Sequence, residues 1–154
     1  MNKFSQTLQI IDVSGRRCGV GDEGIEQCLK LISINASNNE NITELNRFSE
    51  TLKIIDISDI CGVNDKGIEK CLKLIEIHAS SNEKITDLNR FSETLQIIDI
   101  GGNCGVGDNG FKDCINLKKI YCKWNRKITR LKKGLKAFKN YTSSASSDAR
   151  AAKR

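Results

Sequence analysis

The stretch Phe48-Ser-Glu-Thr-Leu52-Lys-Ile-Ile-Asp56-Ile-Ser58 occurs three times in this chain with few changes. The other copies are Phe4-Ser-Gln-Thr-Leu8-Gln-Ile-Ile-Asp12-Val-Ser14 and Phe91-Ser-Glu-Thr-Leu95-Gln-Ile-Ile-Asp99-Ile-Gly101, so that the period is 44 and then 43 residues. Self-similarity at a fixed period is the sequence signature of a repeat architecture. The sequence therefore predicts stacked copies of one small unit.

A second, related unit lies inside each period. Its three copies are Leu29-Lys-Leu-Ile32-Ser-Ile34, Leu72-Lys-Leu-Ile75-Glu-Ile77 and Leu117-Lys-Lys-Ile120-Tyr-Cys122. If every unit begins at its first leucine, apolar residues stand at positions 1, 4 and 6. The alternation between positions 4 and 6 is that of a strand with one buried face. This frame predicts about six units of roughly 20 to 23 residues over 1–131, the first of them incomplete.

Turn-forming residues and a short helical spacing complete each unit. The strands are followed by Cys-Gly-Val-Gly-Asp or by Asn-rich segments, and then by apolar residues at helical spacing, such as Ile42, Leu45 and Phe48. One strand with one helical turn cannot bury its own apolar face, but stacked copies can. The predicted fold class is an α/β repeat solenoid with a parallel concave β-sheet and short helices or turns on the convex side.

Both kinds of unit resemble the leucine-rich repeat family. The first kind reads Ile11-Asp12-Val13-Ser14, Cys18, Val20-Gly21-Asp22-Glu23-Gly24-Ile25 and Cys28, and is similar to the cysteine-containing subtype. The second kind, as in Ser81-Asn82-Glu83-Lys84-Ile85-Thr86-Asp87-Leu88, is similar to a shorter type with the pattern Asn-x-Ile-Thr-Asp-Leu. The resemblance covers Phe4 to Leu131. It implies a leucine-rich-repeat arc, which is a scaffold for many different partners.

Positions 3, 5 and 7 would form the open face of the predicted sheet, whose strands lie about 4.8 Å apart. Position 3 supplies an aliphatic row, namely Ile10, Leu31, Ile54, Leu74, Ile97 and Lys119. Position 5 supplies a mostly acidic row, namely Asp12, Ser33, Asp56, Glu76, Asp99 and Tyr121. Position 7 supplies Ser14, Asn35, Ser58, His78, Gly101 and Lys123.

Exposed aliphatic side chains rimmed by charge are typical of a protein-binding surface. The alternative is that the aliphatic row packs only against itself and that the acids hydrogen-bond within the repeat. The residues predicted to bind a partner protein are Ile10, Asp12, Leu31, Ile54, Asp56, Leu74, Glu76, His78, Ile97, Asp99 and Tyr121.

Neither catalysis nor metal binding is expected. Ser58, His78 and Asp99 fall on successive predicted strands, with Glu76 on the same face, as a nucleophile and its base would require. The sequence supplies no oxyanion hole, and only one repeat carries a histidine, so we expect a surface histidine, no enzymatic activity and no cofactor.

The cysteines follow the repeat as well. They recur every 43 residues, as Cys18, Cys61 and Cys104 and again as Cys28, Cys71 and Cys114. Such positions stack along a repeat protein instead of clustering into one four-ligand site. We therefore expect small buried side chains with reduced thiols, and no zinc site.

Basic residues are concentrated in the last quarter of the chain. The formal net charge is +6, but the 38 residues from Leu117 to Arg154 hold 13 basic residues and a single acid. Leu131, Leu135 and Phe138 recur at helical spacing with lysines between them. This pattern predicts a basic amphipathic capping helix over 129–141, followed by a disordered tail over 142–154.

These cations make the C-terminal region a candidate for binding RNA or another polyanion, with Tyr121 and Trp124 as nearby aromatic residues. The candidates are Lys119, Lys123, Arg126, Lys127, Arg130, Lys132, Lys133, Lys136 and Lys139. The alternatives are a basic face that is only solvated, and a Trp124 that covers the edge of the core.

Two expectations concern the surroundings of the protein. No apolar run is long enough to span a bilayer, and Met1-Asn2-Lys3-Phe4 does not open a secretory signal, so we expect an intracellular, cytoplasmic protein without membrane contact. The same four residues align with Leu45-Asn46-Arg47-Phe48, so the first repeat lacks a cap. We expect a homodimer or a larger assembly to cover that edge.

The sequence favours a non-catalytic module that binds a partner protein through the concave face. The alternative is a structural component that docks on RNA or a ribonucleoprotein through the basic C-terminal region.

Overall fold

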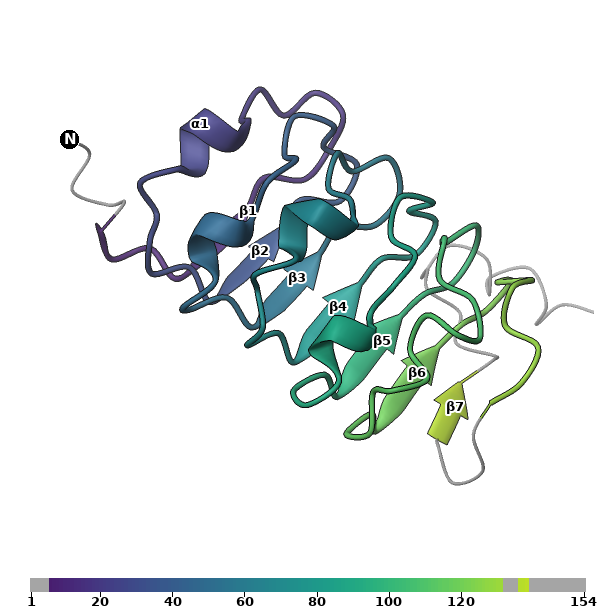
Figure 1. The fold of residues 1–154 in the computed structure, drawn as a ribbon. Helices are drawn as coiled ribbons and strands as arrows, with labels where there is room; N and C mark the ends of the chain where they lie inside the picture. The colour runs from purple at the N-terminus through teal and green to yellow at the C-terminus, as the bar shows by residue number, and fades with distance from the viewer. Residues whose placement is uncertain (1–5, 132–135, 139–154) are drawn as a thin grey trace, which may run out of the picture.

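One parallel sheet runs through the part of the chain that the structure describes (Figure 1). The structure is a computed structural model that describes residues 6–131 and the backbone of residues 136–138. The strands are β1 (Ile10–Asp12), β2 (Ser33–Asn35), β3 (Ile54–Asp56), β4 (Glu76–His78), β5 (Ile97–Asp99), β6 (Lys119–Tyr121) and β7 (Lys136–Phe138). Each pairs in parallel with its neighbours in the sequence. The arrangement is therefore repeat-like and α/β, as predicted.

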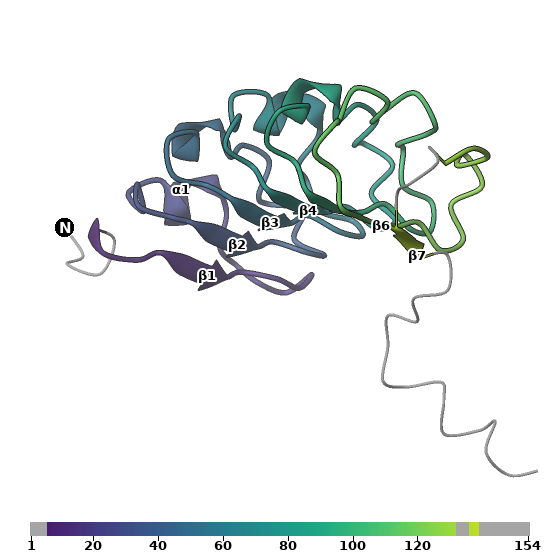
Figure 2. The same ribbon diagram turned by 90° about the horizontal axis from the view of Figure 1, so that it is seen from below.

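Short helical turns lie on one side of this sheet. They are α1 (Asp22–Ile25), η2 (Asn46–Phe48), η3 (Asp65–Ile68) and η4 (Asn89–Phe91), the last three being 3-10 helices. Figure 2 shows that the sheet is arched, with these turns above its convex side and its concave side open. In η3 the side chain of Asn64 accepts hydrogen bonds from the backbone N–H groups of Lys66 and Gly67, which satisfies the first turn of the helix.

The core lies between the sheet and the helical turns. Leu52, Ile55 and Ile57, at positions 1, 4 and 6 of the third unit, are fully buried, as predicted. Phe48 and Phe91 enter the same core from the turns. Their burial supplies the hydrophobic stabilisation that no single unit has alone.

Buried asparagines join the second, fourth and sixth units to the unit before each of them. The Asn82 side chain donates to the carbonyl oxygens of Ile57 (2.8 Å) and Val63 (3.2 Å) and accepts from the backbone N–H of Lys84 (3.0 Å). Asn39 and Asn125 make the same three kinds of hydrogen bond at an interval of 43 residues. All three are buried, so each is satisfied entirely by backbone groups.

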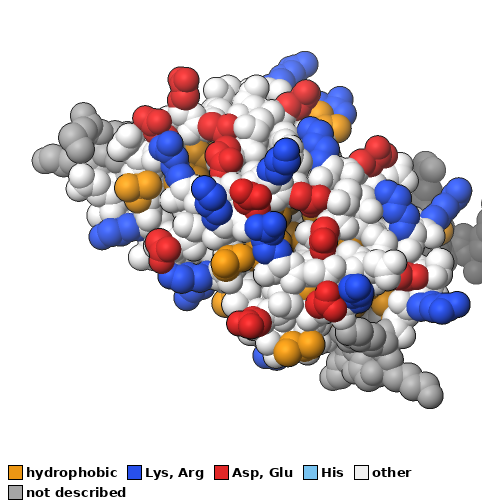
Figure 3. Space-filling view, viewed as in Figure 1, with side chains coloured by type: hydrophobic (Ala, Val, Ile, Leu, Met, Phe, Trp, Pro, Cys, Tyr) orange, Lys and Arg blue, Asp and Glu red, His pale blue; other side chains and the backbone are white. Residues whose placement is uncertain are grey.

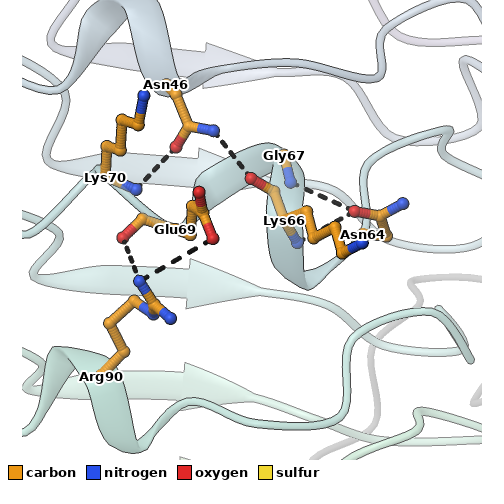
Figure 4. Close-up of polar contacts among 7 residues, drawn as sticks. All are labelled: Asn46, Asn64, Lys66, Gly67, Glu69, Lys70 and Arg90. Carbon is orange, nitrogen blue, oxygen red and sulfur yellow. Dashed lines mark hydrogen bonds and ion pairs between the residues drawn. The ribbon is translucent and has the colours of Figure 1, made fainter.

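Polar side chains also connect successive units beside the helical turns (Figure 4). Asn46 donates to the carbonyl oxygen of Lys66 (2.7 Å) and accepts from the backbone N–H of Lys70 (2.6 Å). One unit later, the guanidinium of Arg90 donates to the carbonyl oxygen of Glu69 (3.1 Å). Figure 3 shows that lysines and arginines are mixed with acids on this side of the molecule.

The strand register corrects the predicted frame of two units. Ile34 pairs with Ile11 and Ile55, so Ile34 stands at position 4 and the second unit begins at Leu31. The fourth unit begins at Leu74 for the same reason. Leu31 and Leu74 are 0% exposed, so their prediction as partner-binding residues is wrong.

The reason for the error is that Leu-Lys-Leu fits period-2 alternation in either frame. Only the frame that begins at the second leucine spaces all units almost evenly, at 21 to 23 residues. It buries Leu74, which packs in the core, and leaves Leu72 53% exposed.

The C-terminal segment also differs from its prediction. The expected helix over 129–141 is contradicted by β7, which pairs with β6 so that Ala137 stands opposite Ile120. The edge of a parallel sheet has unpaired backbone N–H and C=O groups. The three residues of β7 form hydrogen bonds with those of β6, and this pairing outweighs the helical spacing of the apolar residues. Residues 132–135 and the predicted tail over 142–154 lie outside the described residues.

Candidate functional site: the concave groove

The corrected register assigns four rows to the concave side, each with one residue from every unit. Row 3 is Ile10, Ser33, Ile54, Glu76, Ile97 and Lys119. Row 5 is Asp12, Asn35, Asp56, His78, Asp99 and Tyr121. Beyond the strands, row 7 is Ser14, Ser37, Ser58, Ser80, Gly101 and Lys123, and row 8 is Gly15, Asn38, Asp59, Ser81, Gly102 and Trp124.

Row 3 is not the continuous aliphatic stripe that we predicted. Ile10 is 72% and Ile54 38% exposed, and Ile97 is half-buried, but polar residues separate them. The concave side therefore presents single apolar side chains among polar ones.

A shallow groove of about 940 Å³ crosses the concave side from β3 to β6. We call this hollow the concave groove. Rows 5, 7 and 8 of the third to sixth units provide most of its lining, namely Asp56, Ser58, Asp59, His78, Ser80, Ser81, Asp99, Gly101, Gly102, Tyr121, Lys123 and Trp124. Ser37, Glu76, Ile97 and Lys119 complete it. Of the residues predicted to bind a partner, the groove brings together Asp56, Glu76, His78, Ile97, Asp99 and Tyr121; Ile10, Asp12 and Ile54 lie outside its lining.

Charge is divided along the groove. The carboxylates are Asp56, Asp59, Glu76 and Asp99, which belong to the third, fourth and fifth units. The cations are Lys119 and Lys123, which belong to the sixth. A bound chain that follows the groove would therefore meet an acidic stretch first and a basic one after it.

The aspartates of row 5 also stabilise the ends of their own strands. Asp56 accepts a hydrogen bond from the backbone N–H of Ser58 (3.0 Å), and Asp99 accepts from the backbone N–H of Gly101 (3.1 Å) and from the hydroxyl of Ser80. In β1 the donation by Ser14 lowers the pKa of Asp12. Asp56 and Asp99 therefore form hydrogen bonds within the repeat, as the alternative prediction has it, and they also line the groove.

His78 occupies the middle of row 5, opposite Asp56 on β3 and Asp99 on β5. Its Nε2 lies 2.8 Å from Oε1 of Glu76 on its own strand. Asp99 is engaged instead by Ser80 and Gly101, so the histidine is not oriented by Asp99 as a catalytic triad would require. Among the described residues, no group of His, Cys, Asp and Glu is placed to hold a metal ion.

Row 8 adopts an unusual backbone conformation in every unit. Its six residues all have positive φ: Gly15 (100°), Asn38 (58°), Asp59 (60°), Ser81 (60°), Gly102 (59°) and Trp124 (64°). In this left-handed region glycine is unstrained and Asn and Asp are tolerated, whereas other residues lose about 1 to 2 kcal/mol. Trp124 is the bulkiest of the six, and its side chain is 78% exposed. The alternative that Trp124 covers the core edge is therefore wrong.

The predicted polyanion-binding residues do not form one patch. Lys119 and Lys123 line the concave groove, and Arg126 borders Trp124. Lys127 donates to the carbonyl oxygen of Gly105 (3.5 Å), and the backbone of Arg130 donates to Asp108, away from the groove. Lys132, Lys133 and Lys139 lie outside the described residues, as does the side chain of Lys136.

The cysteine side chains pack between units, as predicted, except for Cys18, which is half-buried. Cys71 and Cys114 donate to the carbonyl oxygens of Leu45 and Leu88, each at 3.3 Å. Burial raises the pKa of Cys71 to about 12 and that of Cys104 to about 11, so these thiols stay protonated at neutral pH. They are structural side chains and poor nucleophiles.

Several residues of the groove were not among the predicted site residues, namely Gly101, Gly102, the serines of row 7 and Trp124, which was named only as an aromatic residue near the candidate cations. The serines carried a usable signal, because Ser14, Ser37, Ser58 and Ser80 recur at evenly spaced positions once the frame is right. Trp124 carried a weaker one, since its equivalents Gly15 and Gly102 indicate a position with positive φ.

Comparison with protein-family models finds none that matches the chain, and a search of curated proteins finds no match. Among the described residues, no helix is long and apolar enough to cross a membrane.

Proposed function

We propose that the chain is a leucine-rich-repeat solenoid that binds a partner protein through the concave groove and catalyses no reaction. The observation that carries this proposal is the groove itself, which equivalent positions of four adjacent units line with acids on one side and lysines on the other. Concave surfaces of stacked repeats are the usual binding surfaces of such proteins.

The stacking hydrogen bonds of the units support this assignment. The buried asparagines and the turn-side contacts join the units without any side chain of row 3. Ile54 and Lys119 are consequently exposed without a role in the core. Complementary charges across such a surface select a partner and speed its association. The homodimer through the first unit and the cytoplasmic location stay predictions.

The proposal is tested by capturing partners from a cell extract with the full chain and with two charge variants. Asp56→Asn with Glu76→Lys alters the groove, and Glu83→Lys with Glu93→Gln makes an equal change in net charge at exposed acids outside its lining. We expect a protein captured by the wild type and the second variant to be lost with the first. A partner set that is the same for all three proteins would contradict the proposal.

A further inference from the structure

The hollow beside Trp124 is distinct in chemistry from the acidic part of the concave groove. It has a volume of about 570 Å³ and is lined by Ser81, Gly102, Asn103, Trp124, Asn125 and Arg126. The only charged residue among these is a cation, Arg126. An anionic ligand is therefore favoured here, whereas the acids of β3 to β5 disfavour it.

The fifth unit carries two glycines in rows 7 and 8, next to Lys123 and Trp124 of the sixth unit. Where the units on either side carry Ser80 and Ser81, or Lys123 and Trp124, the fifth unit carries Gly101 and Gly102. A Cβ at Gly102 would overlap the hydroxyl of Ser81. The backbone of Gly102 is therefore packed closely against Ser81, and Gly102 and Trp124 line both the concave groove and the hollow beside Trp124.

Trp124 itself contributes little to the fold. Its side chain is 78% exposed, and its φ of 64° is unfavourable for a bulky residue. A strained residue that is also exposed is typical of a binding site, because neither packing nor backbone geometry favours it.

Two cations lie near the exposed ring. The Nζ atom of Lys123 lies 5.3 Å from the centroid of the indole, and Arg126 lines the same hollow. Lys119 on β6 is exposed at the adjoining end of the groove. An aromatic platform among cations suits a ligand with flat rings joined by negative groups, which describes a single-stranded nucleic acid.

We propose that the Trp124 hollow binds single-stranded nucleic acid, with a base stacked on the indole and the adjoining phosphates beside Lys123 and Arg126. The site recognises a base by stacking and the phosphates by their charge, without a preference for base sequence. This is a second binding site at the end of the concave groove, and it does not depend on the partner protein proposed above.

The sole tryptophan of the chain makes the test direct. The full chain is titrated with a ten-nucleotide single-stranded oligonucleotide and, as the matched probe, with an abasic oligonucleotide of the same length and charge. We expect the base-containing strand to quench the fluorescence of Trp124 and to bind about tenfold or more tighter than the abasic strand. Equal affinity for both strands would overturn the proposal and leave only attraction of phosphate by the basic C-terminal region.

A variant separates stacking from a structural role. Trp124→Asn suits positive φ, so we expect its unfolding midpoint to be unchanged or higher, while its affinity for a labelled oligonucleotide falls about tenfold or more. Ile115→Asn removes another exposed apolar side chain as the control and should bind like the wild type. Unchanged affinity in Trp124→Asn, a lower unfolding midpoint with no specific loss of binding, or no binding by the wild type would each contradict the proposal.

Discussion

On the convex side, the same contact recurs every 43 residues: the Asp22, Asp65 and Asp108 carboxylates accept from the backbone and hydroxyl groups of Thr43, Thr86 and Thr129. On the concave side, row 5 keeps an aspartate at nearly the same interval in the first, third and fifth units, but it changes from Asn35 to His78 to Tyr121 in the units between them. Repetition is kept where side chains join one unit to the next and in rows 3 and 5 of the first, third and fifth units, and it is lost in these rows of the second, fourth and sixth units. Stacking therefore does not dictate which side chains the second, fourth and sixth units present in rows 3 and 5.

The largest expected effect on the free energy of unfolding tests which of Leu72 and Leu74 faces the core. Leu74→Ala removes a fully buried side chain and should lower the free energy of unfolding by about 4 kcal/mol, because a cavity remains in the core. Leu72→Ala, two residues earlier, removes an exposed side chain and should cost less than about 0.5 kcal/mol. Chemical denaturation measures both. Equal losses would contradict the corrected register.

The next effect concerns the buried asparagines. Asn82→Ala would leave the carbonyl oxygens of Ile57 and Val63 and the N–H of Lys84 without their partner, so we expect a loss of about 3 kcal/mol. Asn103→Ala, at an exposed asparagine, is the control and should change the free energy of unfolding by less than about 0.5 kcal/mol. A loss below about 1 kcal/mol in Asn82→Ala would show that these hydrogen bonds do not hold the units together.

The sequence predicted the parallel sheet and the buried positions of Leu52, Ile55 and Ile57, because nearly identical copies repeat both the alternation and the turns. Period-2 alternation did not decide between Leu72 and Leu74, and only the even spacing of the units favours Leu74. The helical spacing of Leu131, Leu135 and Phe138 was overridden by the pairing of β7 with β6. A local sequence pattern does not show which backbone groups a neighbouring strand leaves unpaired.

The candidate site was predictable only in part for a similar reason. Asp56 and Asp99 were predicted correctly because their units begin at a leucine that fits only one frame. In the second and fourth units, the wrong frame assigned Leu31 and Leu74 to position 3, which Ser33 and Glu76 occupy in the structure. The exposure of Trp124 depends on the left-handed turn of row 8, for which the only sequence signal is glycine at the equivalent positions Gly15 and Gly102.

A smaller effect is expected from removing one hydroxyl on the convex side, compared with removing one on the concave side. Thr86→Val removes the hydroxyl that donates to Asp65 and keeps the side-chain volume, so we expect a loss of about 1 kcal/mol. Ser58→Ala, in row 7 of the concave groove, should cost less than about 0.5 kcal/mol. Thermal and chemical denaturation of both variants measure the difference, and the reverse order would overturn the division of roles between the two sides.

The smallest effect is a pH dependence on the convex side. The Thr129 hydroxyl, together with the backbone N–H groups of Thr129 and Arg130, lowers the pKa of Asp108 below its ordinary value of 3.8. The stability that this carboxylate contributes is therefore present above pH 3.8 and is lost as the pH falls through the lower folded-state pKa. An NMR titration should give a midpoint below 3.8 that rises in Thr129→Val. A midpoint that the substitution leaves unchanged would show that the hydroxyl does not stabilise the charge.

Photo-crosslinking tests the central claim, binding through the concave groove, most directly. A photoreactive amino acid is placed at position 78, in the middle of the groove, and in a second protein at position 66, in η3 on the convex side. Irradiation in the cells that make the protein should give a discrete adduct with one partner protein from position 78 and none from position 66. Equal adducts from both positions, or an adduct from position 66 alone, would contradict the proposal.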